Sequence, residues 1–414
     1  MLREAGLPRR FSLQNTFASL KYPNYRLWFA GQLVSLVGTW AQSAAQGYLI
    51  YELTKSPAYL GYVSFASGLP TWIFTLYAGA IADRVSRRTL MVITQSGMMI
   101  LAIILAWLTF TGAIEWWHIL ILAFLLGVCN AFDAPARQAF VLEMVEREDL
   151  TNAIALNSTM FNLAMVMGPA FGGLIYAWVG PGWCFTINAL SFLAVIIALL
   201  LMKLKPFVPV KSTRSTFSDT REGLKYVVHH PSVKILIFSL FVITILGLGV
   251  AALLPAWSVE VLGGNAATNG FLMTARGVGS LISALIIATL GHFRFRGKLW
   301  TVNSLILPIS MVVFAFMQWM VPSLLTMAVM GFAFMMIVNL SNSMVQTRIA
   351  DEMRGRVMGV YTFFFFGAMP IGSLLSGWAA EIIGEPLTVM ISGLILLLFG
   401  VWMVWRRPDI RALE

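Results

Sequence analysis

The feature that most constrains this chain is a series of apolar runs, each about as long as a bilayer is thick. A helix needs roughly 20 apolar residues to cross the hydrocarbon core. Hydrophobic residues make up 59% of the chain and charged residues only 11%, a composition outside the range of soluble domains. We expect about twelve membrane spans, at 27–53, 57–82, 88–111, 116–142, 152–178, 182–202, 233–257, 266–290, 298–318, 322–347, 354–380 and 386–405.

The basic residues are distributed unevenly between the two ends of these spans. Of the 28 Lys and Arg residues, the expected outer loops contain only Lys55, and Arg276 lies inside a span. The others lie in or beside the termini and the opposite loops, and an excess of positive charge marks the cytoplasmic side. We therefore expect a multi-pass protein of the cell inner membrane with both termini in the cytoplasm. The net charge of +10 then indicates membrane lipids as partners, and not nucleic acid.

The polar stretch at 203–232 divides the spans into two sets of about six. Phe217, Leu224, Tyr226 and Val227 recur in it at near-helical spacing, which predicts a linker with a short interfacial helix. The linker is either a tether between two bodies that rock or a solvated spacer. The expected domains are a cytoplasmic lead-in at 1–26, an N-terminal six-helix bundle at 27–202, the linker at 203–232, a C-terminal six-helix bundle at 233–405 and a cytoplasmic tail at 406–414.

A short loop between the second and third spans carries one acid and three arginines. Its residues are Gly79, Asp83, Arg84, Arg87 and Arg88. Asp83 would close a helix at its C-terminal end, where the helix dipole disfavours a carboxylate, so it needs another partner. The pattern resembles the loop signature of the major facilitator superfamily, which usually has glycine where this chain has Ser86.

This resemblance implies a fold and a role for the loop. The superfamily has an internal two-fold repeat of six spans with a central site between the halves, and the two halves of this chain are weakly alike. We expect an all-α membrane protein with about twelve transmembrane helices in two pseudo-symmetric six-helix bundles. In the family the loop acid lies against the start of span eleven, which would make Asp83, with Arg354 and Arg356, a conformational latch. A loop that only fixes topology is the alternative.

Span five contains a Gly-Pro-x-x-Gly-Gly sequence formed by Gly168, Pro169, Gly172 and Gly173. Small residues let two helices approach closely, and proline removes a backbone donor. The order resembles the span-five motif of drug–proton antiporters within the superfamily, with Ala164 in place of its leading glycine. Ordinary close packing in a membrane helix is the alternative.

The stretch at 130–149, together with this motif, looks like the bacterial exporter branch that includes enterobactin-exporter-like and multidrug-like proteins. The resemblance covers most of the N-terminal half, and it says almost nothing about the substrate. It implies export driven by inward protons.

Polar side chains form a stripe on one face of span one. Ser35, Thr39, Gln42 and Gln46 are spaced four, three and four residues apart, so they share a helix face. Lipid cannot satisfy such a stripe, so it must face protein or water. In the superfamily, spans one, four, seven and ten line the cavity. The expected cavity residues are Ser35, Thr39, Gln42, Gln46, Asn130, Asn157, Asn162, Arg276, Asn339, Asn342 and Gln346. Hydrogen bonding between helices is the alternative for each.

Arg276 is the only basic residue expected deep in the membrane. A charge at mid-bilayer costs at least about 2.5 kcal/mol, so Arg276 must face a partner or a wet cavity. It would anchor either an anionic substrate group or a titrating carboxylate. A fixed structural ion pair is the alternative.

Asp133 is the one acid expected well inside a span, and Arg137 follows it one turn later. Desolvation there penalises the charged carboxylate, whereas the arginine favours it. This pair is the candidate for proton coupling. A permanent ion pair that shapes the end of the helix explains the same spacing, and both interpretations remain open.

The sequence has no nucleotide-binding loop, metal-ligand spacing or haem pair. We therefore expect no enzyme, no cofactor and no metal. The function expected is secondary active transport, in which a monomer exports a small amphipathic molecule, drug-like or siderophore-like, by proton antiport with alternating access. The alternative is a symporter or a lysolipid-type flippase that uses Arg276 to hold an anionic head group.

Overall fold

The computed structural model describes residues 17–82, 85–204, 216–290 and 295–412, and this part of the chain is almost entirely helical. Twelve long helical segments follow one another. The first six are α2 (Pro23–Thr54), α3 (Pro57–Ala82), α4 (Arg87–Phe110), α5 (Trp116–Met144), α6 (Leu150–Val179) and α7 (Pro181–Leu201). After α8 (Thr216–His229), the seventh runs from Pro231 to Val261, and the last five are α11 (Ala266–Leu290), α12 (Arg296–Phe314), α13 (Met320–Gln346), α14 (Arg354–Ile383) and α15 (Glu385–Arg406).

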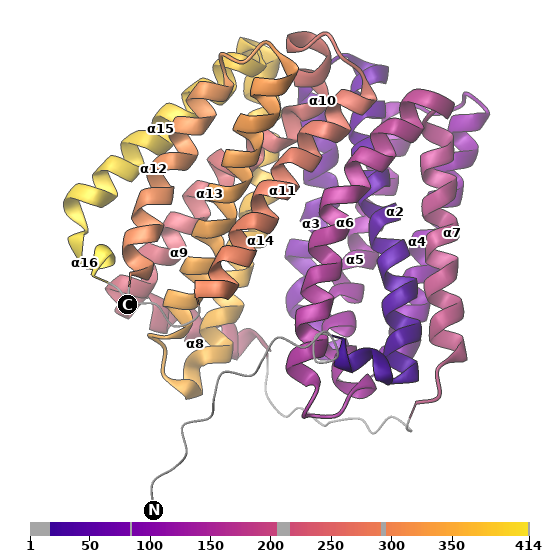
Figure 1. Ribbon diagram of the computed structural model, residues 1–414, viewed down its shortest axis with the longest axis horizontal. Coiled ribbons are helices and arrows are strands. Elements are labelled where there is room, and N and C mark those ends of the chain that lie inside the picture. Colours follow the sequence, from indigo (N-terminus) through magenta and orange to yellow (C-terminus); the bar gives the residue numbers. More distant parts are fainter. Residues whose placement is uncertain (1–16, 83–84, 205–215, 291–294, 413–414) are drawn as a thin grey trace, which may run out of the picture.

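These helices form two groups that stand side by side in Figure 1. The first group, α2 to α7, is drawn in indigo to magenta, and the second lies beside it in pink, orange and yellow. Within the described residues, ten helices are long and apolar enough to cross a membrane. The other two long helices are α2, of 32 residues, and α3, of 26 residues. The all-α membrane fold expected from the sequence is confirmed.

The seventh segment is the one that departs most from a regular helix. The sequence predicts a span at 233–257, whereas the structure has α9 (Pro231–Ile243), a π-helical turn at Thr244–Leu248, a 3-10 stretch at Gly249–Leu253, α10 (Leu254–Ala256) and a second π-helical turn at Trp257–Val261. Pro255 lies in this stretch and has no backbone donor for the ladder. Such changes of hydrogen-bonding register are tolerated in a membrane where the backbone is covered by protein or lines a cavity.

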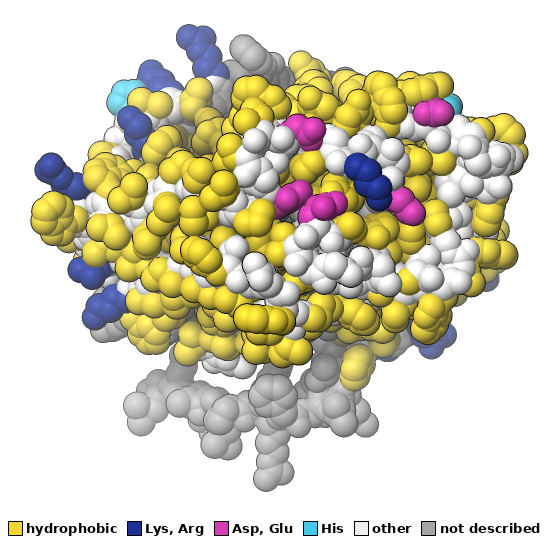
Figure 2. Space-filling model, turned by 90° about the horizontal axis from the view of Figure 1, so that it is seen from above, with side chains coloured by type: hydrophobic (Ala, Val, Ile, Leu, Met, Phe, Trp, Pro, Cys, Tyr) yellow, Lys and Arg dark blue, Asp and Glu magenta, His cyan; other side chains and the backbone are white. Residues whose placement is uncertain are grey.

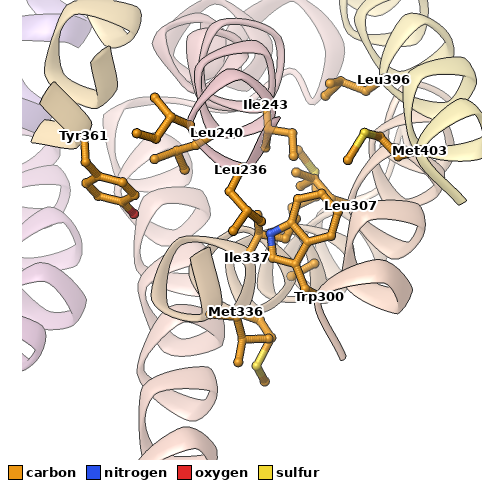
Figure 3. Close-up of a cluster of buried hydrophobic side chains, with 14 of the residues drawn as sticks. Leu236, Leu240, Ile243, Trp300, Leu307, Met336, Ile337, Tyr361, Leu396 and Met403 are labelled. Carbon is orange, nitrogen blue, oxygen red and sulfur yellow. The ribbon is translucent and has the colours of Figure 1, made fainter. Parts of the chain in front are cut away.

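Each group of helices is held together by close side-chain packing. In the second group Leu236, Leu307 and Ile337 lie around the Trp300 ring (Figure 3), and the Trp300 Nε1 donates a hydrogen bond of 2.8 Å to Ser341 Oγ. The indole nitrogen is therefore satisfied within the apolar cluster. Because lipid tails are as apolar as these side chains, van der Waals contact and such hydrogen bonds hold the helices together.

The two groups meet along two helix pairs, α3 with α14 and α6 with α11. On Gly61, an added Cβ would lie 2.8 Å from the Ser373 carbonyl oxygen, and on Gly270 it would lie 2.4 Å from the Pro169 carbonyl oxygen. The Thr274 Oγ1 also donates a hydrogen bond of 2.7 Å to the Val166 carbonyl across the second pair. Glycine is required here because the backbones approach too closely for a side chain.

The two ends of the molecule differ in charge. We call the end that carries Glu52, Glu260 and Glu381 the acidic face, and Figure 2 shows acidic side chains gathered near its centre. We call the opposite end, which carries Lys21 and Arg407, the basic face. The chain enters α2 and leaves α15 on this second side.

A contact on the basic face fixes the start of the first helix. Asp149, before α6, accepts a hydrogen bond of 2.8 Å from the Tyr22 hydroxyl and pairs with the Lys21 ammonium at 2.6 Å. The Lys21 ammonium, and then the Tyr22 hydroxyl, hold the pKa of the Asp149 carboxyl below its usual range. The contact is therefore fully present above about pH 4, the ordinary aspartate pKa, and is lost as the pH falls further.

Candidate functional site

A cavity of about 500 Å³ lies between the two groups of helices. Its volume falls within the usual range for sites that bind drug-sized molecules. Apolar and aromatic side chains form much of the wall, among them Trp40, Phe192 and Phe366. The polar and charged residues that line it are Thr39, Gln42, Ser43, Gln46, Ser64, Ser67, Thr71, Asn130, Asn188, Asn269, Arg276 and Ser373.

Five of the eleven expected cavity residues line this space. They are Thr39, Gln42, Gln46, Asn130 and Arg276. Ser35 is buried in α2 below the cavity, and its carbonyl accepts a hydrogen bond of 2.8 Å from Thr39 Oγ1.

The other expected residues lie on α6 and α13 and are not among those that line this cavity. Asn157 is half-buried in α6, and Asn162 Nδ2 donates a hydrogen bond of 2.8 Å to the Ser158 carbonyl of its own helix. Asn339 is half-buried in α13, and Gln346 Nε2 donates a hydrogen bond of 2.6 Å to Asn342 Oδ1.

Two asparagines that sequence reasoning did not place in the cavity line its wall. Asn188 of α7 donates from Nδ2 to Gln42 Oε1 at 2.7 Å and so fixes the glutamine on the neighbouring helix. Asn269 of α11 is 1% exposed, and its Nδ2 donates a weak hydrogen bond of 3.4 Å to the Ala44 carbonyl. A lone asparagine in a span whose only other polar side chains are the hydroxyls of Thr186 and Ser191 was the signal for Asn188, because lipid cannot satisfy the amide.

Among the described residues that line the cavity, Arg276 is the only ionisable one. It lies on α11, seven residues after Asn269 and therefore on the same face of the helix. Gly331 of α13 packs against its backbone, since an added Cβ there would lie 2.1 Å from the Arg276 carbonyl oxygen. Within the described part of the chain, neither a carboxylate nor a hydrogen-bond acceptor pairs with its guanidinium.

Asp133 is buried between α4 and α5 and does not line the cavity. Its Oδ1 accepts hydrogen bonds from Thr94 Oγ1 at 2.9 Å and from Gln95 Nε2 at 3.1 Å. Its Oδ2 lies 3.8 Å from Arg137 Nε, a long separation for an ion pair. Oδ1 therefore accepts two hydrogen bonds of normal length, whereas Oδ2 has only the long contact with the arginine.

A family model described as transmembrane secretion effector matches residues 14–412. The chain belongs to this family of the major facilitator superfamily. It is therefore a multi-pass membrane transporter.

Curated relatives and solved structures agree with this assignment. The chain is 24% identical over 371 residues to the staphyloferrin A transporter of Staphylococcus aureus, with 89% of this chain and 92% of that protein covered. It is 28% identical over 379 residues to the multidrug efflux pump Tap of Mycolicibacterium fortuitum, with 89% and 91% covered. A bacterial homologue of the human lysosomal transporter Spinster, in an inward-facing and unoccupied conformation, has the same fold, with a TM-score of 0.73, 11% identity and 97% and 98% covered.

The loop motif typical of this superfamily is described only in part. Asp83 and Arg84 lie outside the described residues, and Gly79 belongs to the last turns of α3. Arg87 pairs with Glu143 of α5 at 2.8 Å, and Arg88 donates to the Leu200 carbonyl of α7 at 2.8 Å, so both hold α4 to its own bundle.

The two arginines at the start of α14 also have partners. Arg354 pairs with Asp351 at 2.5 Å, and Arg356 pairs with Glu222 of α8 at 2.8 Å. The second contact attaches the linker helix to the second bundle. The latch itself stays a prediction.

The Gly-Pro motif of this transporter packs against α2 on one side and against α11 on the other. Gly172 packs inside the first bundle, because an added Cβ would lie 2.4 Å from the Ala41 carbonyl oxygen of α2. Gly173 faces the second bundle, where an added Cβ would lie 2.5 Å from the Ala266 carbonyl oxygen of α11. Gly168 also packs on α2, and the Pro169 carbonyl lies against Gly270 of α11. One short motif therefore sets both the packing within a bundle and the contact between bundles.

Hydrogen bonds join the two bundles at the acidic face. The Tyr51 hydroxyl donates to Glu260 Oε1 at 2.7 Å, the Ser56 hydroxyl donates to Glu381 Oε2 at 2.6 Å, and the Ala58 amide donates to the same oxygen at 3.3 Å. We call these five residues the acidic-face clasp. Every donor belongs to the first bundle and every acceptor to the second, so the clasp closes the acidic side of the cavity.

Removing the clasp donors should open the acidic side. In Tyr51→Phe/Ser56→Ala the two carboxylates lose their hydroxyl partners, and hydrogen bonds to charged groups contribute about 1.5–3 kcal/mol each. We expect at least about tenfold faster labelling of Ser43→Cys, in a background without Cys129 and Cys184, by an impermeant maleimide added from that side. Tyr176→Phe is the matched control, because Tyr176 donates to Glu52 within the first bundle alone. Equal labelling of both variants would contradict a clasp between bundles.

Proposed function

We propose that this transporter exports a small amphipathic molecule, drug-like or siderophore-like, by alternating access. The observation that carries the proposal is one polar-and-aromatic cavity between two bundles, with a clasp closing its acidic side. One relative is a multidrug efflux pump, which supports export, and another is a staphyloferrin A transporter, which supports a siderophore-like substrate.

We propose that the basic face is cytoplasmic and that the protein lies in the inner membrane. Among the described residues, Lys55 is the only lysine or arginine at the acidic face, and Arg276 is in the cavity wall. The rest lie toward the basic face, as the positive-inside rule requires. With this orientation both termini are cytoplasmic, and the cavity in this conformation belongs to the inward-facing half of the cycle.

The bodies that move in this proposal are the bundles at 27–202 and 233–405, joined by the linker at 203–232. Glycines line both helix pairs that join them, so small residues let the backbones slide and tilt past each other. Contact of Asp83 with the start of α14 would hold the opposite, outward-facing state. The transporter would act as a monomer.

We propose that inward protons drive export, with Asp133 and Arg137 as the coupling pair. Asp133 is a buried carboxylate in the interior of a span. Its oxygen lies 3.8 Å from Arg137 Nε, and protonation of the carboxylate would weaken this attraction further. The alternative function, a symporter or lysolipid-type flippase, is favoured by one observation, the unpaired guanidinium of Arg276 in the cavity.

Transport by the purified protein in proteoliposomes tests the proposal. With a panel of dyes, siderophores and lysolipids, we expect amphiphiles to accumulate on the side of the acidic face when that side is more acidic. A protonophore should abolish the accumulation while leaving counterflow exchange intact. Accumulation that survives the protonophore would exclude proton antiport, and movement of lysolipids alone would favour the flippase.

A further inference from the structure

The charge of the cavity wall restricts what the cavity can bind. Arg276 contributes one positive charge, and the remaining lining residues are amides, hydroxyls and apolar or aromatic groups. An arginine guanidinium stays protonated at physiological pH. The described wall therefore carries one cation and no carboxylate, and a cationic molecule placed in it would meet a like charge without compensation.

Four carboxylates inside or at the ends of the described spans accept hydrogen bonds elsewhere, and Glu385, at the start of α15, does not line the cavity. Asp133 accepts from Thr94 and Gln95 and does not reach the cavity. At the acidic face, Glu260 and Glu381 accept hydrogen bonds in the clasp, and Glu52 accepts one from Tyr176. Arg276 thus has no counterion of its own among the described residues, although an unpaired cation at this depth is costly.

A ligand group can supply the missing charge. A guanidinium presents a planar fork of donors that matches a carboxylate, sulfonate or phosphate with two parallel hydrogen bonds. The rest of the wall suits an apolar body, since Trp40, Phe192 and Phe366 line the same space. The 500 Å³ volume accommodates one such molecule of drug size.

We infer that the central cavity is a binding site for a single-charged organic anion with an apolar body, and that Arg276 is the residue that binds its anionic group. The inference rests on the proposed function for the direction of transport, but its site is defined by binding alone. It assigns the exported molecule to the amphipathic anions and excludes amphipathic cations. The anionic group would belong either to a free organic anion or to a lysolipid head group.

Two dyes with the same ring system allow the contribution of the negative charge to binding to be measured. 8-Anilino-1-naphthalenesulfonate carries one negative charge, and N-phenyl-1-naphthylamine is its neutral counterpart. Binding of each to the full-length protein in nanodiscs, corrected for partition into protein-free nanodiscs, gives the preference for the anion. We expect wild type to prefer the anion by at least about tenfold and ethidium to compete poorly, because charge-assisted hydrogen bonds are stronger than neutral ones.

Substitutions at Arg276 then assign the preference to one side chain. Arg276→Gln should bind both dyes with similar affinity, and Arg276→Lys should keep part of the preference, because it retains the charge but loses the fork. Lys55→Gln removes a positive charge outside the cavity and should leave the preference unchanged. If Arg276→Gln does not fold, the Arg276→Lys result and the wild-type dye ratio still decide the question.

The outcomes separate the inference from the proposed function. An unchanged dye ratio in Arg276→Gln, or equal binding of the two dyes by wild type, would overturn the anion site even if uphill export occurs. A preference that depends on Arg276 in a protein that fails to export would support the site and refute the proposed direction of transport. Competition by lysophosphatidylglycerol stronger than that by oleate would support the anion site with a lipid head group as its ligand, and the reverse order would support it with a free anion.

Discussion

Asp133→Asn should abolish uphill, proton-driven efflux and leave downhill exchange of substrate intact. Asparagine can still accept a hydrogen bond from Thr94 or Gln95, which contact Oδ1 of the native carboxylate, but it cannot take up or release a proton. Arg137 would lose its partner, yet its side chain is 23% exposed and water can hydrate it. We therefore expect a cost in stability of about 1–3 kcal/mol and a protein that still folds.

The measurement compares two assays on the same proteoliposomes. Uphill efflux is followed under an imposed pH gradient, and exchange is followed without one. Thr94→Val is the control, because it removes one hydrogen-bond donor to Asp133 and leaves the carboxylate in place, so coupling should persist. If both activities of Asp133→Asn fall together, the residue is a structural partner of Arg137. If the variant keeps uphill efflux that a protonophore still collapses, the proton moves through another group.

Gly173→Ala should shift the transporter away from the conformation with a closed acidic side. The new Cβ would lie 2.5 Å from the Ala266 carbonyl oxygen and 3.1 Å from the Ala267 Cα, which are backbone atoms that cannot rotate away. Overpacking of this kind costs typically about 1–3 kcal/mol, which converts to roughly a 5- to 150-fold shift between conformations. Separation of α6 from α11 relieves the clash.

The adjacent glycine is the control for this prediction. Gly172→Ala adds the same methyl group against Ala41 of α2, inside the first bundle. We expect it to lower the melting temperature without changing the labelling of Ser43→Cys from the acidic side, whereas Gly173→Ala should increase that labelling and slow transport. Gly270→Ala, across the same interface from Gly173, should behave like Gly173→Ala. Unchanged labelling in both of those variants would show that this helix pair does not control the acidic side.

The positions of the helices followed closely from the sequence, because span length is set by bilayer thickness. The expected spans at 57–82 and 266–290 coincide with α3 and α11, and the other regular spans differ at their ends by a few residues. Charge gave an expectation about the environment of one residue. An arginine in a span has to face a partner or a cavity, and Arg276 lines the cavity.

The cavity wall was less predictable, because periodicity does not fix the rotation of a helix about its axis. The α2 stripe was recognisable because three of its members share a helix face that meets the cavity. Polar residues of α6 and α13 satisfy themselves locally instead, as Asn162 does with the Ser158 carbonyl. Asn188 contributes through a partner on another helix, which only the assembled bundle brings within reach.

The irregular seventh segment gives the cavity one compliant wall. Leu248, Ala251 and Pro255 line the cavity from the stretch in which π and 3-10 turns replace the regular ladder. A turn that already lacks the regular bonds can change its pitch by exchanging a few carbonyl partners, whereas α2, which also lines the cavity, is a continuous helix of 32 residues. Substrates of different width would then contact one rigid helix, α2, and one segment whose backbone can change conformation. The backbone of the seventh segment would then set the range of substrate sizes, and the side chain of Arg276 would set the selectivity for charge.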